Sequence, residues 1–219
     1  MSTEQVRARI RGPLAALLVL LAAAPASAGA LRGNVANGRT AEIRRARARD
    51  TVVWLEQVPE KTERQLTHTR FRWFRHRRVA PPLPQIVESG RMFEPHVIAL
   101  AAGGTLVIRN QDKVWHGAFS VSPARAFDLG KRAPGRADTL TFDRPGVVAL
   151  RCDIHPAMSA FVIVTPNHAF TRPDSAGDWR LPDLPAGHYT VHAWHPAKGE
   201  LRRGVDVPAK GAANLALRW

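Results

Sequence analysis

The sequence predicts an all-β protein built from two small β-sandwiches. Short segments with strand-like alternation recur from about residue 85 to residue 219, and turn signals such as Pro134-Gly135 and Pro145-Gly146 separate them. Helical periodicity is scarce in the same region. A mature chain of roughly 190 residues is long enough for one large core or for two small ones.

Residues 1–28 are expected to form a signal peptide. The segment MSTEQVRARIRG carries three arginines, PLAALLVLLAAAPA is apolar, and ASA follows with the small residues that signal peptidase prefers. The apolar run spans about 14 residues, whereas a transmembrane helix needs roughly 20. We therefore expect export to the periplasm, or secretion, and no transmembrane segment after the signal is removed.

The net charge of the chain limits its partners. The formal net charge is +14, and most of it lies outside the expected signal peptide. A basic surface favours acidic partners or anionic lipid. Nucleic acid is not expected as a partner of an exported protein.

The rest of the chain divides into four segments. Residues 29–58 include the strand-like run TVVWLEQV. Residues 59–84 are basic and end in prolines, so we expect a linker or surface loop whose arginines form a solvated face or a docking patch for an acidic partner. Residues 85–165 hold about eight short strands, enough for one sandwich. Residues 166–219 hold further strands, among them HYTVHAWH and GVDV.

Cys152 is the only cysteine of the chain. Cysteines of exported proteins usually pair, because they meet oxidising conditions. A single exported thiol is therefore an intermolecular disulfide, a nucleophile or a metal ligand. His155 could serve as an activating base, but no segment resembles an oxyanion hole, so catalysis by the thiol is the weaker interpretation.

The neighbours of Cys152 favour a metal site. His155 and Met158 follow it at steps of three, in a loop between the strand-like runs GVVALRC and SAFVIV. His116 lies between two other predicted strands, and the loops of a sandwich gather at its ends, where His116 can meet the Cys152 loop. A thiolate, two imidazoles and a weak thioether form the ligand set of electron-transfer copper sites. Zinc seldom takes a thioether, and calcium prefers oxygen.

Residues 85–165 resemble a cupredoxin, a small blue copper protein. The match consists of FEPHVIALAAGGTLVIRNQDKVWHGAFSV, with its F-x-P and N-x-D motifs before a histidine, and of FDRPGVVALRCDIHPAMSAFVIV, with a short C-x-x-H-x-x-M loop. The resemblance implies a Greek-key β-sandwich that binds one type 1 copper ion through four ligands, namely His116, Cys152, His155 and Met158. Gly117 and Asp153 depart from the family pattern, in which Asn and Ser or Thr brace the loops around the sulfur.

Residues 166–219 look like part of a carboxypeptidase-regulatory-like, transthyretin-type β-sandwich. The resemblance rests on D-x-x-G-x-W-x-L, on L-P-x-G-x-Y and on the strand that ends at Trp194-His195. Residues 29–58 resemble the opening of the same module, so we expect residues 29–58 and 166–219 to form one sandwich into which the copper domain is inserted. The alternative is an N-terminal extension and a separate C-terminal domain. Pairing of residues 52–55 with the copper domain would exclude the insertion.

The resemblance implies a periplasmic carrier of single electrons, not an enzyme. Its partner would be a redox protein, such as a cytochrome or a periplasmic dehydrogenase, with an acidic surface. In this fold the loop histidine is nearest to solvent, so His155 is the expected electron port, with Pro95, Pro156 and Ala157 as an apolar patch around it. Two alternatives remain open at this point, a copper carrier or storage protein and a protein- or carbohydrate-binding module.

Overall fold

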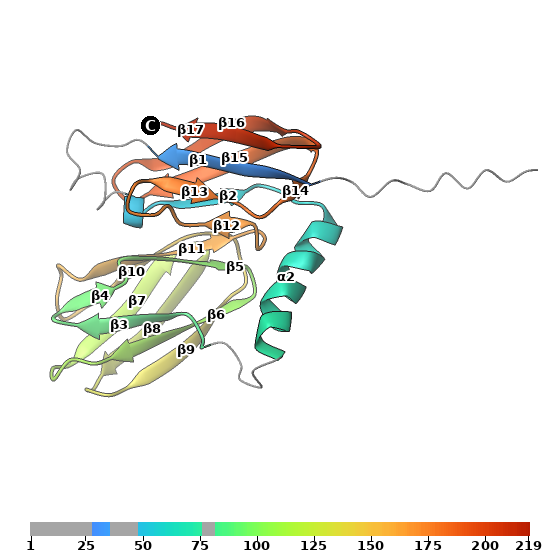
Figure 1. The fold of residues 1–219 in the computed structure, drawn as a ribbon. Coiled ribbons are helices and arrows are strands. Elements are labelled where there is room, and N and C mark those ends of the chain that lie inside the picture. The colour runs from blue at the N-terminus through green and yellow to red at the C-terminus, as the bar shows by residue number, and fades with distance from the viewer. Residues whose placement is uncertain (1–27, 36–47, 76–81) are drawn as a thin grey trace, which may run out of the picture.

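The structure, a computed structural model, describes residues 28–35, 48–75 and 82–219. Its secondary structure confirms the all-β class, because the described residues contain seventeen strands and a single helix (Figure 1). Nearly all of the expected signal peptide lies outside the described residues, so it stays a prediction. Within the described ranges, no helix combines the length and the apolar character that crossing a membrane requires.

The central sandwich consists of strands β3 to β11. One of its sheets has the order β5-β11-β10-β7-β8 and the other the order β4-β3-β6-β9. β5 pairs in parallel with β11, and β3 pairs in parallel with β6. The chain crosses several times between the two sheets, so strands adjacent in sequence often belong to different sheets. The bounds are β3 Gln85–Ser89, β4 Met92–Glu94, β5 Val97–Ala101, β6 Gly104–Asn110, β7 His116–Ser122, β8 Arg125–Arg132, β9 Ala137–Phe142, β10 Gly146–Arg151 and β11 Ser159–Thr165.

Alternating side chains fill the core of the central sandwich. In β6, Leu106 and Ile108 are fully buried while Arg109 between Ile108 and Asn110 is exposed, as the period of two in a strand requires. Cys152 and Met158 belong to the same buried cluster as these residues. The expected metal loop is therefore anchored in the core and does not lie loosely on the surface.

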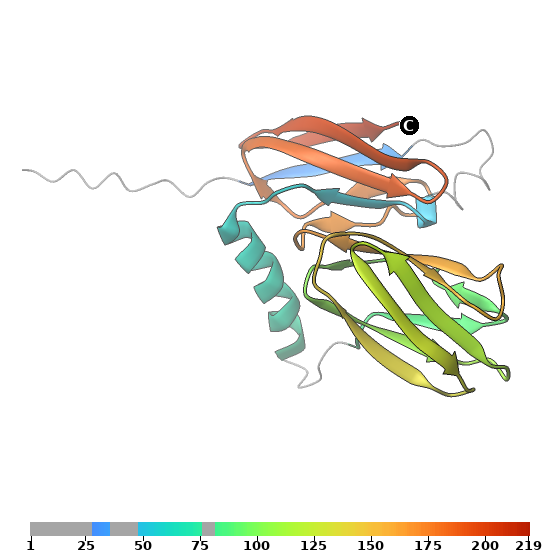
Figure 2. The same cartoon turned by 180° about the vertical axis from the view of Figure 1, so that it is seen from behind.

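The second sandwich, called the split sandwich below, consists of β1, β2 and β12 to β17, so its strands come from both ends of the chain (Figures 1 and 2). β1 pairs in parallel with β17, and β2 pairs with β12 and β15. Among the described residues, the pairing partners of residues 52–55 thus belong to this sandwich, which is the arrangement that the insertion hypothesis requires. The bounds are β1 Ala28–Val35, β2 Val52–Leu55, β12 Phe170–Thr171, β13 Asp178–Arg180, β14 Leu184–Pro185, β15 Gly187–His195, β16 Gly199–Val207 and β17 Ala212–Leu217.

Helix α2, Glu60–Arg75, replaces most of the linker or surface loop that we expected at residues 59–84. Glu60 and Glu63 lie in its first turn, where the helix dipole favours negative charge, and the carbonyl of Pro59 accepts a hydrogen bond from the Glu63 amide at 3.0 Å. The Glu63 carboxylate also accepts bonds from the backbone and the ring of His168. These contacts fix a segment whose composition alone suggested an irregular loop.

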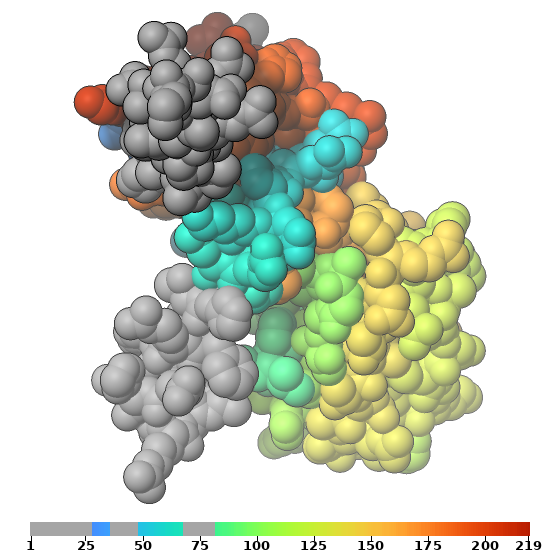
Figure 3. Space-filling model, turned by 90° about the vertical axis from the view of Figure 1, so that its right-hand side faces the viewer, coloured from blue at the N-terminus to red at the C-terminus, as the bar shows by residue number. Residues whose placement is uncertain are grey.

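A separate apolar cluster joins the two sandwiches. Trp54 and Trp194 of the split sandwich pack with Val97 and Ile163 of the central one. The centroids of the Trp194 and Phe161 rings lie 5.0 Å apart. In Figure 3 the residues at the start of α2 lie at the junction of the two sandwiches. The interface between the two sandwiches is therefore a packed apolar core.

Candidate metal site

The structure brings the predicted ligand segments to one end of the central sandwich. His116 is the first residue of β7, Cys152 follows the last residue of β10, and Met158 precedes β11. The Cys152 loop is closed by two backbone hydrogen bonds, from the Met158 amide to the His155 carbonyl at 2.9 Å and from the Cys152 amide to the Met158 carbonyl at 3.4 Å. The short loop predicted from the spacing is thus a compact turn.

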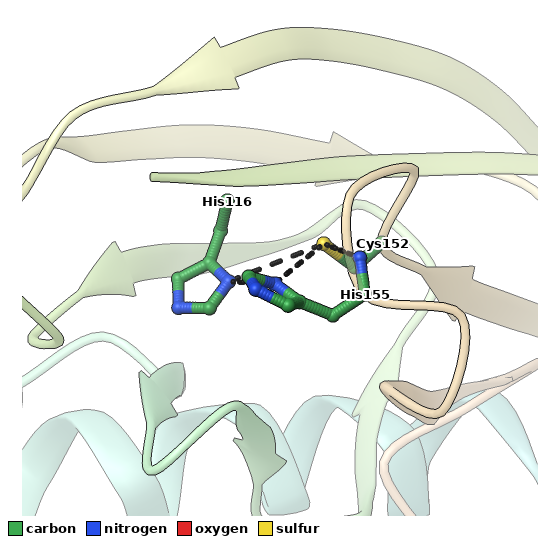
Figure 4. A group of neighbouring side chains, drawn as sticks. All are labelled: His116, Cys152 and His155. Atoms are coloured by element: carbon green, nitrogen blue, oxygen red, sulfur yellow. Dashed lines mark hydrogen bonds between the residues drawn. The ribbon is translucent and has the colours of Figure 1, made fainter. Parts of the chain in front are cut away.

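Three donor atoms of these residues converge (Figure 4). Nδ1 of His116 lies 3.0 Å from Nδ1 of His155, and the Cys152 sulfur lies 4.0 Å and 3.8 Å from these two nitrogens. His116 is fully buried, Cys152 is 5% exposed and His155 is half-buried. The sulfur also accepts hydrogen bonds from the backbone amides of Gly117 and His155, each at 3.4 Å.

The spacing of these donors fits a single metal ion. A ligand nitrogen or sulfur lies about 2.0–2.3 Å from a bound zinc ion, so two ligands of one ion are at most about 4.6 Å apart. All three donor pairs lie within that limit. Met158 is 2% exposed and packs in the same cluster as Cys152. Its thioether as a fourth ligand stays a prediction.

Asp112 is a polar neighbour of the site that the sequence analysis missed. Its Oδ2 lies 2.7 Å from Nε2 of His116, on the side of the ring opposite Nδ1. Burial would raise the pKa of Asp112, but hydrogen bonds from the Arg91 amide, from His116 and from the Gly90 amide outweigh it and hold the pKa below its ordinary value. The available signal was its position four residues before His116, within the N-x-D motif.

A buried ion-pair network lies beside β7. Arg132, which pairs with His116 across the β7–β8 ladder, is 2% exposed and donates to Glu88 at 2.5 Å and to Asp138 at 2.9 Å. Burial raises the pKa of the fully buried Glu88, and Arg132 offsets this only in part. The network therefore fixes the strand opposite His116.

The two departures from the family pattern fit each other. A Cβ atom added at Gly117 would lie 1.7 Å from Oδ1 of Asp153. The Asp153 carboxylate thus occupies the space into which an Asn at position 117 would project.

The surface around His155 is partly apolar. Pro95, Pro156 and Ala157, expected as a patch, are all exposed. Trp115 and Ile154, which directly precede His116 and His155, are 56% and 37% exposed and were not predicted to take part. The sequence alone did not indicate this exposure, because it depends on where the neighbouring strands begin and end.

Comparisons with solved structures found similarity over part of the chain. Over 39% of its length the chain is similar to a copper-containing nitrite reductase from Thermus scotoductus SA-01, with 26% identity, a TM-score of 0.37 and 23% of that chain covered. Over the same share it is similar to a mutant of amicyanin in the Cu(I) state, with 21% identity, a TM-score of 0.36 and 85% of that chain covered. TM-scores this low carry no argument about function, which must rest on the site itself.

The remaining comparisons found no similarity. No protein-family model matches the chain, and no curated protein is similar to it. The carboxypeptidase-regulatory-like character of the split sandwich therefore stays a prediction.

Proposed function

We propose that the protein is an exported, periplasmic type 1 copper protein that carries single electrons between redox partners. The proposal rests on one observation, the convergence of two imidazole nitrogens and the single thiol at the end of a β-sandwich. A thiolate with two imidazoles is the equatorial set of electron-transfer copper sites. Bound copper would supply the one-electron change between Cu(I) and Cu(II).

The chain's own residues have distinct roles in this proposal. Cys152 serves as the thiolate, and the Gly117 and His155 amides stabilise its negative charge. His116 would be the buried imidazole ligand and His155 the half-exposed one, so His155 would provide the shortest route to a partner. Met158 would supply a weak thioether ligand from a side chain held in the core.

The surface of this end fits an acidic redox partner. Exposed cations lie on the segments that surround the site, namely Arg91, Lys113, Lys131 and Arg151. Trp115 and Ile154 add exposed apolar area beside the two histidines. Small apolar contacts with a charged rim suit transient redox encounters, since opposite charge speeds association. A cytochrome or a periplasmic dehydrogenase with an acidic face is the class of partner we propose.

The burial of the ligands favours electron transfer over copper delivery. A protein that hands copper to an acceptor must expose its ligands during exchange. Here His116 is fully buried and Cys152 nearly so. A closed site retains its ion through many redox cycles, whereas release would require the loop to open.

The test is a Cu(II) titration of the purified mature protein, followed by visible absorption and electron paramagnetic resonance. We expect an intense thiolate-to-copper band and a narrow copper hyperfine splitting. Cys152→Ser is the matched control and should abolish both features. A weak band with a wide splitting that Cys152→Ser leaves unchanged would refute the proposal and favour the carrier or binding-module alternatives.

A further inference from the structure

The ring of His116 has hydrogen-bonding partners on both of its nitrogens. Nδ1 faces the Cys152 sulfur and the ring of His155, and Nε2 lies 2.7 Å from Oδ2 of Asp112. An ionised carboxylate can only accept hydrogen bonds. Nε2 therefore carries a proton in this contact, and in the neutral ring Nδ1 keeps its lone pair, which faces the Cys152 sulfur and the His155 ring.

Asp112 is itself held in place by the turn between β3 and β4. Its Oδ1 accepts the amide of Gly90 at 2.7 Å and its Oδ2 accepts the amide of Arg91 at 2.9 Å. Both turn residues have positive φ, 61° and 59°, so their amides point in the same direction and form an anion-binding concavity. Arg91 accepts a conformation that non-glycine residues rarely adopt, and the Asp112 contact provides a reason for it.

The backbone of Asp112 is fixed as well. Its amide donates to the side-chain oxygen of Asn110 at 3.0 Å. The amide group of Asn110 in turn donates to the carbonyls of Val114 and Arg132, at 2.9 Å and 3.0 Å. Since Asn110 is fully buried, this loop has little freedom to move the carboxylate away from His116.

We infer that Asp112 is the positioning residue of the metal site: it holds the His116 proton on Nε2 and aims Nδ1 at the point shared with Cys152 and His155. The inference about tautomer and ring orientation concerns the metal-free protein, and its consequence for copper rests on the proposed function. Carboxylates that orient a ligand histidine also raise its basicity. The negative charge of Asp112 therefore favours the more highly charged metal state, Cu(II).

The experiment compares the wild type with Asp112→Asn, which keeps the shape of the side chain. An amide has one acceptor oxygen, so it cannot accept from Gly90 on one side and from Arg91 and His116 on the other. Asp153→Asn is the matched control, because it removes the same charge at the same end of the sandwich while its carboxylate lies against Gly117. Each protein is examined by long-range ¹H–¹⁵N NMR of the imidazoles without metal, by zinc and copper titration, and by voltammetry.

We expect the wild-type His116 to carry its proton on Nε2 and Asp112→Asn to lose that single tautomer. Affinity for zinc and for Cu(II) should fall by about 10- to 100-fold in Asp112→Asn, and the reduction potential should rise. Asp153→Asn should keep the tautomer and the zinc affinity. If the reduction potential rises more in Asp112→Asn than in Asp153→Asn, the effect comes from the position of the His116 ring and not from the loss of one negative charge alone.

Two results would overturn the inference. One is a wild-type His116 protonated on Nδ1, a measurement that needs no variant and so does not depend on Asp112→Asn folding. The other is an Asp112→Asn protein whose tautomer, affinities and potential match those of Asp153→Asn. Failure of the proposed function looks different, since the wild type would then show the expected tautomer and bind zinc but give no thiolate-to-copper band.

Discussion

Replacing Arg132 by Met should be among the most destabilising substitutions in the central sandwich. The guanidinium makes four hydrogen bonds from a position that is 2% exposed, to Glu88 at 2.5 Å, to Asp138 at 2.9 Å and to the carbonyls of Ile108 and Arg136 at 2.5 Å and 3.5 Å. Methionine fills the space of the side-chain stem but bonds none of these oxygens. The fully buried Glu88 is then left without its counter-ion.

Breaking a buried ion pair by removing one partner costs about 3–5 kcal/mol. In a chain of this size, each kcal/mol of lost stability lowers the melting temperature by about 2–4 °C. The melting temperature should therefore fall by roughly 6–20 °C. The loss should depend on pH, because burial raises the pKa of Glu88 and Arg132 lowers it, so removal of Arg132 leaves the raising effect of burial less opposed. A native state that binds the proton more tightly is favoured as the pH falls. The destabilisation should therefore be largest above the folded pKa of Glu88 and shrink below it.

The assay is urea unfolding of both proteins between pH 5 and pH 8, followed by tryptophan fluorescence and circular dichroism. Arg136→Met is the matched control, since Arg136 is exposed and shares the partner Asp138. It should leave the free energy of unfolding nearly unchanged. Equal effects of the two substitutions, or an Arg132→Met loss that grows as the pH falls, would refute this reasoning.

Three further substitutions probe the split sandwich and its contact with the central sandwich. Trp194→Ala empties the cluster between the sandwiches, and we expect a loss of about 3–5 kcal/mol with the single melting transition splitting into two in calorimetry. Gly33→Ala places a Cβ 1.8 Å from the Leu215 carbonyl oxygen, so urea unfolding should show a loss of about 1–3 kcal/mol or more. For Glu200, burial would raise the pKa, but hydrogen bonds from a guanidinium and an imidazole outweigh it, so the pKa is lowered. Its contribution to stability is present above the unfolded pKa and is lost as the pH falls, and Glu200→Gln should weaken the acid dependence of the melting temperature.

The all-β class could be predicted because strand alternation and turn residues are local signals. Helix α2 could not, because part of what fixes it lies far away in the sequence. Glu63 bonds to His168, 105 residues later, and Leu66 packs against the core of the split sandwich. Read locally, the segment shows many charges and terminal prolines, which are typical of a loop.

The candidate site also contains contacts that the sequence could predict and contacts that it could not. Cys152 and His155 are close in sequence, so their contact follows from a short loop, and the structure brings them together as predicted. The approach of His116 depends on which loops of the sandwich share an end. The gathering of loops at the ends of a sandwich made this contact possible, and the resemblance to cupredoxins then implied it. The contact of Asp112 with His116 depends on the turn at Gly90 and Arg91, which no local pattern predicts.

The two halves of the site differ in how they are held, and this difference suggests a division of labour. His116 is fully buried, and its ring is fixed through Asp112 to a turn of the other sheet. His155 is half-buried on a loop closed by two backbone hydrogen bonds, with exposed Ile154 beside it. Under the proposed function, the buried half would retain the metal ion and the loop half would meet the partner. Substitutions near Asp112 should therefore change metal affinity and potential, whereas substitutions at Ile154 should change the rate of exchange with a partner and leave the affinity intact.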